Sequence, residues 1–430
     1  MNKTFVSRVG ITGMTFAALL AAYAGAATAR DEGGLKLRDM QPKVKAPIYR
    51  FGVDPDQDKK MEEQFDSKAT RLLAWLPLDA FEGEHNTGND CWGYVSPSGR
   101  EYAIIGLEKG FGIVEVTNPT SPTIIKTIKG PTSLWHDVKV IGSVAYGVSE
   151  GGAGMQVMDL SRIDEGEVTH VQNRMHAGHS TTHNIASNTD TGYLYLCGPN
   201  IANGGLVAVS TEDPLNPTIV GAWPDMYVHD AQVVSYKEGP YAGREIAFCA
   251  SGFGNGSGDT ALRIVDVTDK TNMHTIGFVE WAQSQYSHQC WLSEDRKYLY
   301  LNDELDEEAY GKNTTTHVFD VSDLSNPKDV GTFSSGVKAI DHNNYVRGNH
   351  IYQANYRSGL RVFRNDDPMN PQQVAFFDTY PDDDRAAFNG AWSCYPYFPS
   401  GTVLISDIER GLFIVDVLAD DESIASANSQ

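Results

Sequence analysis

Long apolar runs are missing from most of this 430-residue sequence. After residue 30, no apolar run reaches the roughly 20 residues that a membrane-spanning helix needs, so we expect no membrane span. Basic residues are also scarce, because 34 Lys and Arg stand against 56 Asp and Glu, a formal net charge of −22. Binding to a phosphate backbone needs clustered basic residues, so this charge excludes nucleic acid as a partner. The net charge does not exclude cations or neutral molecules as ligands.

Cysteine is scarce as well. Five Cys in the whole chain are too few for a disulfide scaffold. Cys197 and Cys249 end equivalent predicted strands of adjacent repeats, so a disulfide between them and buried free thiols are both open. The sequence also lacks a Gly-rich phosphate loop, a nucleophile-elbow serine and paired zinc-ribbon cysteines. Any chemistry must therefore come from another arrangement of residues.

The N-terminus has the pattern of a secretory signal. Lys3 and Arg8 precede an apolar, Ala-rich stretch, and Ala-Thr-Ala at 27–29 offers a cleavage site. We therefore expect a secreted protein, periplasmic or extracellular, with an uncleaved anchor helix as the alternative. The expected organisation is a signal peptide over 1–29, a polar lead-in over 30–68 that wraps the surface or stays mobile, a folded domain over 69–418 and a polar tail over 419–430.

A repeated strand start indicates the architecture. His followed by a polar residue stands at the second and third positions of five segments: WHDVKV (135–140), THNIAS (182–187), VHDAQVV (228–234), SHQCWL (287–292) and DHNNYV (341–346). Two further segments fit the same place without His, namely CWGYVS (91–96) and WSCYPY (392–397). The residues in this place are spaced 45 to 59 positions apart, in the range of propeller blades: Cys91, His136, His183, His229, His288, His342 and Trp392.

Each repeat continues in short, β-branched, alternating segments bounded by Gly, Asn, Asp and Pro, a pattern typical of antiparallel strands. Four such segments in each of seven repeats predict an all-β, seven-bladed β-propeller. The last repeat ends at LFIVDV (412–417) without a fourth strand, whereas a matching pattern, RLLAWLPLD (71–79), precedes the first repeat. We predict that this N-terminal strand completes the last blade, because an open propeller would expose a strand edge.

The repeated third strands, close to L-x-I-V-D-V, resemble the LVIVD-repeat family of secreted proteins. The segment over 88–122, GNDCWGYVSPSGREYAIIGLEKGFGIVEVTNPTSP, is similar to the start of the choice-of-anchor B group within that family. The resemblance covers about residues 69–418. It implies a propeller and an extracytoplasmic location, and it implies no particular activity.

The histidines of the repeat are candidate metal ligands. In a propeller the first strand of each blade lines the central axis, so these side chains are expected to meet at one mouth of the channel. Neutral imidazoles on separate rigid strands suit a divalent transition metal and can leave one coordination position open. We predict that a Cu, Fe, Mn or Zn ion is held by three or more of the five histidines His136, His183, His229, His288 and His342. The alternative is a structural repeat in which each His hydrogen-bonds a loop carbonyl.

The second strand of each blade returns to the same mouth, and polar residues in the following turns are therefore candidates for catalysis or binding. Glu150, Asp303 and Tyr356 are predicted acids or bases, and Arg357 is predicted to hold an anionic group. The predicted ligand-binding residues at the rim are Glu108, Glu409 and Trp392. For the acidic residues the alternative is solvated charge at a hairpin turn.

Two acidic segments leave a Ca²⁺ site open. The insertion DELDEEAYG (303–311) fits a lid, a calcium loop or solvated charge. Asp54, Asp56 and Asp58 alternate like the start of a calcium loop, but Lys59 and Phe65 replace the Gly and Glu of an EF-hand. An EF-hand is thus excluded, whereas a looser Ca²⁺ site is not.

Two classes of function fit these patterns. The first is a secreted metal-dependent enzyme at the channel mouth, and the sequence does not distinguish oxidation from lyase or hydrolase chemistry. The second is a non-catalytic recognition or adhesion scaffold that binds a glycan, a peptide or a protein at the rim. In both cases a small molecule, a glycan or a peptide would lie at the mouth.

Overall fold

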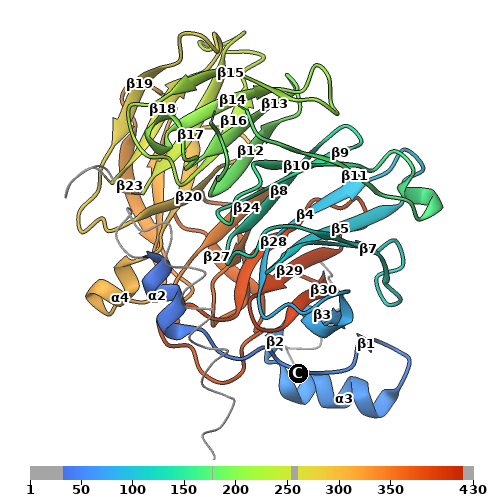
Figure 1. Ribbon diagram of the computed structural model, residues 1–430. Helices are drawn as coiled ribbons and strands as arrows, with labels where there is room; N and C mark the ends of the chain where they lie inside the picture. Colours follow the sequence, from blue (N-terminus) through green and yellow to red (C-terminus); the bar gives the residue numbers. More distant parts are fainter. Residues whose placement is uncertain (1–31, 177, 253–259, 420–430) are drawn as a thin grey trace, which may run out of the picture.

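The computed structural model describes residues 32–176, 178–252 and 260–419. These residues form an all-β propeller of seven blades (Figure 1), which confirms the fold predicted from the repeats. The expected signal peptide and all but the first residue of the expected tail lie outside the described residues. Among the described residues, no helix has the length and apolar character of a membrane-spanning segment.

Each blade is a four-stranded antiparallel meander. From blade one to blade seven, the innermost strands are β4 (Gly88–Val95), β8 (His136–Ile141), β12 (Asn184–Asn188), β16 (Asp230–Ser235), β20 (Ser287–Leu292), β24 (Asn343–Arg347) and β28 (Ala391–Tyr395). The second strands are β5 (Glu101–Leu107), β9 (Val144–Ser149), β13 (Tyr193–Cys197), β17 (Glu245–Ser251), β21 (Tyr298–Asp303), β25 (His350–Ala354) and β29 (Val403–Asp407).

The outer strands follow the same order. The third strands are β6 (Gly110–Glu115), β10 (Met155–Asp159), β14 (Leu206–Ser210), β18 (Ala261–Asp266), β22 (Thr316–Asp320), β26 (Leu360–Arg364) and β30 (Gly411–Val417). The fourth strands are β7 (Thr123–Lys129), β11 (Thr169–Arg174), β15 (Thr218–Trp223), β19 (His274–Val279), β23 (Lys328–Phe333), β27 (Gln372–Phe377) and, for blade seven, β3 (Thr70–Leu76).

The N-terminal strand closes the ring, as predicted. β3 pairs antiparallel with β30, and Trp75 lies opposite Phe413 in this register. The innermost strand β28 of blade seven contacts β4 of blade one. Two short strands extend the outer edges of two blades: β1 (Tyr49–Arg50) pairs with β3, and β2 (Ser67–Lys68) pairs with β27. The last blade therefore combines strands from both ends of the domain.

The core lies between the blades, which explains why inner strands are apolar on both faces. β5 and β9 are buried over their whole length, whereas β11 alternates between exposed and partly buried residues. Close blade packing requires glycine at Gly147 of β9, because a Cβ atom there would lie 2.3 Å from the Phe111 ring of the preceding blade. Large rings on one blade thus fit above small residues on the next.

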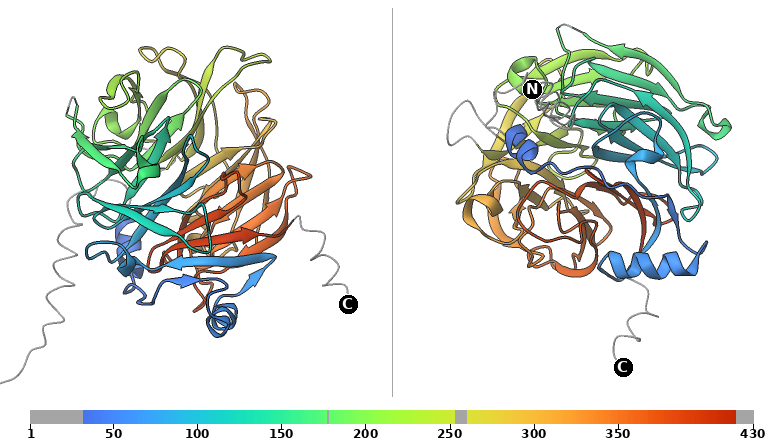
Figure 2. Two further views of the ribbon diagram at one scale, coloured as in Figure 1. Left: turned by 90° about the vertical axis from the view of Figure 1, so that its right-hand side faces the viewer. Right: turned by 60° about the horizontal axis from the view of Figure 1, so that its bottom comes forward.

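The lead-in contains two helices and crosses one face of the disc. α2 (Glu32–Asp39) and α3 (Pro55–Gln64) are joined by a segment that Figure 2 shows running over this face. α2 contacts Trp135 before blade two, Glu304 after a strand of blade five and Phe388 before blade seven. Since these residues come from separate parts of the ring, α2 lies over the channel mouth.

The remaining helical elements are short. Blade five contains α4 (Asp306–Tyr310) after its second strand. The 3₁₀ turns in the described part of the chain are η1 (Leu78–Ala80), η2 (Ile163–Glu165) and η3 (Ala202–Gly204).

The five cysteines are buried free thiols. Of the two alternatives left open for Cys197 and Cys249, the structure shows the free thiols, with each side chain completely buried. Burial raises the pKa of both thiols, so these side chains act as small apolar groups in the core.

Candidate cation site at the channel mouth

Four of the five predicted histidines form a continuous row. Neighbouring ring centroids lie 4.2 Å apart for His183 and His229, 4.1 Å apart for His229 and His288, and 4.1 Å apart for His288 and His342. The residues belong to the starts of the innermost strands of blades three to six, which is the position predicted for them. All four are buried.

The ends of the row are aromatic. Trp135 lies beside His183, with ring centroids 6.0 Å apart, and Trp392 lies 5.2 Å from His342. The fifth predicted histidine, His136, packs edge-on against Phe111 at 5.4 Å. In blade two the residue next to the row is thus Trp135, which directly precedes His136, the residue predicted from the repeat.

The backbone of each following blade fixes the orientation of three of these imidazoles. Nδ1 of His229, His288 and His342 lies 2.8, 3.2 and 2.5 Å from the carbonyl oxygens of His288, His342 and Trp392, respectively. A carbonyl oxygen can only accept, so Nδ1 carries the proton and donates it. In the neutral ring the lone pair then lies on Nε2. This is the tautomer in which metal-binding histidines are commonly held.

The carbonyl contacts also match the structural alternative for the repeat. Two of the rings nevertheless face a buried carboxylate as well. Nε2 of His288 and of His342 lies 3.7 and 3.4 Å from Oε1 of Glu304, which follows the second strand of blade five. Burial, followed by the neighbouring imidazoles and Lys36, holds the pKa of His288 well below its ordinary value. The lone pair on Nε2 of neutral His288 and the carboxylate oxygen of Glu304 therefore point toward each other. This arrangement favours a cation near both atoms.

Lys36 of α2 supplies such a cation. Its ammonium lies 3.1 Å from Oε1 of Glu304 and 4.5 Å from the centroid of the Trp392 ring, and its side chain is only 2% exposed. Leu35 and Met40, on either side of it, pack on the apolar cluster around the mouth. The lead-in therefore inserts a positive charge into the site.

Among the predicted acids and bases, Tyr356 and Glu150 contact this site. The Tyr356 hydroxyl donates to Oε1 of Glu304 at 2.6 Å, and its ring lies 4.5 Å from the ring of His342. Tyr356 has a φ of +37°, a strained conformation for a residue with a side chain. Glu150 hydrogen-bonds Nδ1 of His183 at 2.6 Å.

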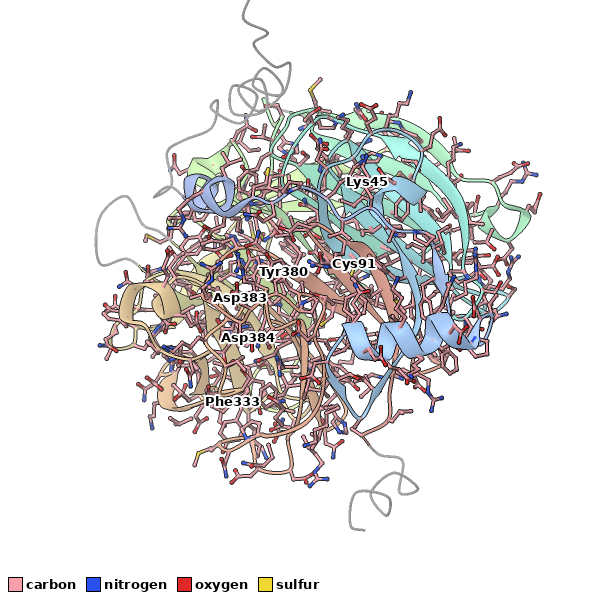
Figure 3. All side chains as sticks on the ribbon, turned by 90° about the horizontal axis from the view of Figure 1, so that it is seen from below. Lys45, Cys91, Phe333, Tyr380, Asp383 and Asp384 are labelled. Atoms are coloured by element: carbon pink, nitrogen blue, oxygen red, sulfur yellow. The ribbon has the colours of Figure 1, made fainter. Side chains whose placement is uncertain are left out.

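Asp303 and Arg357 are engaged by the protein itself. Asp303 accepts hydrogen bonds from the backbone N–H groups of Gln285 and Tyr286, both at 2.7 Å. Burial, and then nearby Asp306, raises its pKa to about 6. The Arg357 guanidinium donates to Asp383 at 2.6 Å and stacks on Tyr380, on the face shown in Figure 3. In this conformation both side chains anchor loops.

The predicted rim residues Glu108 and Glu409 are buried. Glu108 accepts two hydrogen bonds from Asn86, each at 2.9 Å. Glu409 accepts from Asn389 at 2.7 Å and from the backbone of Gly390 at 3.0 Å. Burial, and then Asp407, raises the pKa of Glu409 to about 7. The alternative prediction, that Glu108 and Glu409 are solvated charges at hairpin turns, is therefore wrong.

The first half of the acidic insertion of blade five is buried, contrary to its interpretation as solvated charge, whereas residues 308–311 are exposed. Glu304, Asp306 and Glu307 are inaccessible to solvent, and Asp306 pairs with Lys312 at 2.6 Å. In the lead-in, Asp54 caps α3, and Asp58 accepts a hydrogen bond from Tyr49 at 2.8 Å. The Ca²⁺ site remains a prediction at either place.

Lys36 is absent from the predicted residues of the site, whereas Glu304 belongs to the acidic turn that the sequence places at the rim, without being a predicted metal ligand. Glu304 directly follows the predicted Asp303, and strand alternation turns these neighbours in different directions. Of the described residues, only His288, Glu304 and His342 form a group of three ligand atoms within 4.8 Å of one another. Lys36 had only a weak signal, a single charge between Leu35 and Leu37.

Burial of neutral imidazole predicts a pH-dependent stability. Burial lowers the pKa of His136 to about 3, below its ordinary 6.5. Below pH 6.5 the unfolded chain takes up a proton that the folded chain does not. The contribution of His136 to the free energy of unfolding is therefore complete above that pH and is lost as the pH falls. Between about pH 6 and 4, we expect wild type to lose about 1.4 kcal/mol per pH unit more than His136→Gln. Denaturant unfolding at several pH values measures this difference, and parallel curves would contradict it.

The sequence comparison identifies one repeat. The profile of the LVIVD repeat matches residues 95–129, which cover most of blade one. The chain thus contains an LVIVD repeat within a β-propeller. No curated protein shows significant similarity to the sequence.

Solved structures support the fold. The structure of U3-55K matches with a TM-score of 0.52 at 8% identity, covering 81% of this chain and 98% of that chain. Hydrazine synthase from Kuenenia stuttgartiensis matches with a TM-score of 0.52 at 10% identity, covering 76% of this chain and 95% of that chain. At such identities these likenesses establish the propeller fold alone.

Proposed function

We propose that the protein is a secreted propeller of the choice-of-anchor B group that binds a divalent transition metal at the channel mouth. The ligands would be His288, His342 and Glu304, and the carrying observation is that their three donor atoms lie within 4.8 Å of one another in a buried site. Two imidazoles with one carboxylate suit Zn, Cu, Fe or Mn better than Ca²⁺, which prefers oxygen ligands.

The separations between donor atoms support this proposal. Two ligands at about 2.1 Å from a tetrahedral metal stand about 3.4 Å apart. The Nε2 atoms of His342 and His288 lie 3.4 and 3.7 Å from Oε1 of Glu304, close to that value. A metal would therefore find two of the three donor separations close to those it needs, but Lys36 would have to withdraw from Glu304.

Three protein ligands would leave a coordination position for substrate or water. A bound metal would polarise a substrate oxygen or activate water or O₂ there. The Tyr356 hydroxyl, which donates to Glu304, would be a proton donor in contact with one ligand. Oxidation and lyase or hydrolase chemistry both remain predictions from the sequence.

Metal analysis of untagged protein tests the proposal. We expect about one transition metal per chain. Zn²⁺ affinity should fall at least 100-fold when His288 and His342 are replaced by Ala, since one protein ligand of three would remain. His274→Ala, on the outer strand β19, is the matched control and should bind like wild type. Absence of metal from folded wild type, or full binding by the double variant, would contradict the proposal.

A non-catalytic scaffold is the second candidate. It is favoured by the pairing of Glu304 with Lys36, which already gives the buried carboxylate a counter-charge. In this case α2 would be a structural cover of the channel, and partners would bind elsewhere on the rim. Folded wild type that binds no transition metal would support this candidate.

A further inference from the structure

The surroundings of Lys36 have the features of an ammonium-binding pocket. Its Nζ lies 3.1 Å from a buried carboxylate oxygen of Glu304 and 4.5 Å from the centroid of the Trp392 ring. Three more aromatic rings have their centroids 5.9 Å from the same atom: Trp135, Tyr356 and Phe388. A carboxylate combined with several aromatic faces is how proteins recognise organic ammonium ions.

The propeller itself holds the walls of this pocket in place. Glu304 is fixed by the Tyr356 hydroxyl at 2.6 Å, and the Trp392 carbonyl by Nδ1 of His342 at 2.5 Å. Neither contact involves α2. The pocket is therefore preorganised by blades five to seven, and α2 contributes the ammonium group that fills it, with Leu35 packed beside it.

Beyond the pocket, the helix is held by a few polar contacts and by Leu35, which packs on the apolar cluster around the mouth, as does Met40 just after the helix. Arg38 pairs with Glu308 at 2.7 Å, and both side chains are partly exposed. Asp39 accepts hydrogen bonds from the backbone of Phe388 at 3.2 Å and from the Asn389 side chain at 2.7 Å. A helix of eight residues with such contacts can be displaced without unfolding the blades.

We infer that this pocket binds a primary alkylammonium group, and that Lys36 occupies it from within the chain. A free alkylamine or the lysine side chain of a peptide takes the same place when α2 moves away. The inference goes beyond the proposed metal site, because ammonium recognition requires no metal. A metal ion and an ammonium group cannot occupy the site together, since both would use Oε1 of Glu304.

Lys36→Ala tests this inference in the full chain. The substitution deletes a group that corresponds to n-propylammonium, which is therefore the probe, and n-propanol of similar size is the neutral control. By calorimetry at matched ionic strength, we expect saturable binding of n-propylammonium to Lys36→Ala, at least tenfold tighter than that of n-propanol. Adding Glu304→Gln should abolish this preference. Equal binding of the two probes, or a preference unaffected by Glu304→Gln, would overturn the inference.

Two further arms complete the test. Nα-acetyl-lysine amide replaces the amine as probe: comparable binding supports a lysine side chain as the occupant, and selective binding of n-propylammonium supports a small amine.

If Lys36→Ala does not fold, Arg38→Ala retains Lys36 but loosens α2. We then expect n-propylammonium to change tryptophan fluorescence at a lower concentration in Arg38→Ala than in wild type. Identical titrations would overturn displacement of Lys36.

Discussion

Replacing Lys36 by Ala is expected to raise the affinity of the channel mouth for Zn²⁺ by about 30- to 100-fold. In wild type the metal must displace an ammonium that pairs with Glu304 and lies over Trp392. A hydrogen bond to a charged group contributes about 1.5–3 kcal/mol and a desolvated cation–π contact up to about 2 kcal/mol, partly offset when the released ammonium is hydrated. A remainder of about 2–3 kcal/mol corresponds to this change in affinity. Calorimetric titration of both proteins measures it.

Lys45→Ala is the matched control for this experiment. Lys45 belongs to the same lead-in, on the face shown in Figure 3, but its side chain is exposed. Its removal should leave the Zn²⁺ affinity unchanged. Equal affinities of wild type and Lys36→Ala would show that Lys36 does not compete with the metal. An absence of binding in both would contradict the metal site itself.

Replacing Trp75 by Ala is expected to lower the free energy of unfolding by about 3–5 kcal/mol, the usual cost of removing a large buried aromatic side chain. Trp75 is 2% exposed and stacks on Phe413 with ring centroids 5.4 Å apart. Its indole N–H also donates to the Arg410 carbonyl at 2.7 Å. The substitution thus weakens the contact by which β3 closes the ring. Denaturant unfolding measures the loss.

Met369→Ala provides the comparison for this variant. Met369 is 50% exposed and lies between the third and fourth strands of blade six, so its removal should change stability by no more than about 0.5 kcal/mol. A similarly small loss in Trp75→Ala would mean that the closing strand contributes little to the stability of the ring.

The repeat predicted the fold well because propeller blades are local structures. Blades one to six are each built from consecutive residues, so strand alternation and turn residues are visible at a fixed period. The same period located the four histidines of the row. It also predicted closure, since the missing last strand and the unmatched strand at 71–79 complement each other.

The rest of the site depends on contacts that no local pattern encodes. Lys36 reaches Glu304 across more than half of the sequence, and nothing near either residue identifies its partner. His136 fits the repeat, but its ring packs against Phe111 of the preceding blade. The burial of Glu108 and Glu409 likewise depends on packing between distant segments. Composition alone makes such turns look solvated.

The closing strand also constrains the order of folding. Leu76 pairs with Leu412, about 340 residues later, so the edge of β3 that pairs with β30 has no partner until nearly the whole domain has been synthesised. At about 5–20 residues per second, this delay is roughly 17 to 70 seconds. During that time the apolar stretch from Leu72 to Leu76 is exposed to other chains, so chaperone protection of the nascent polypeptide would matter most there.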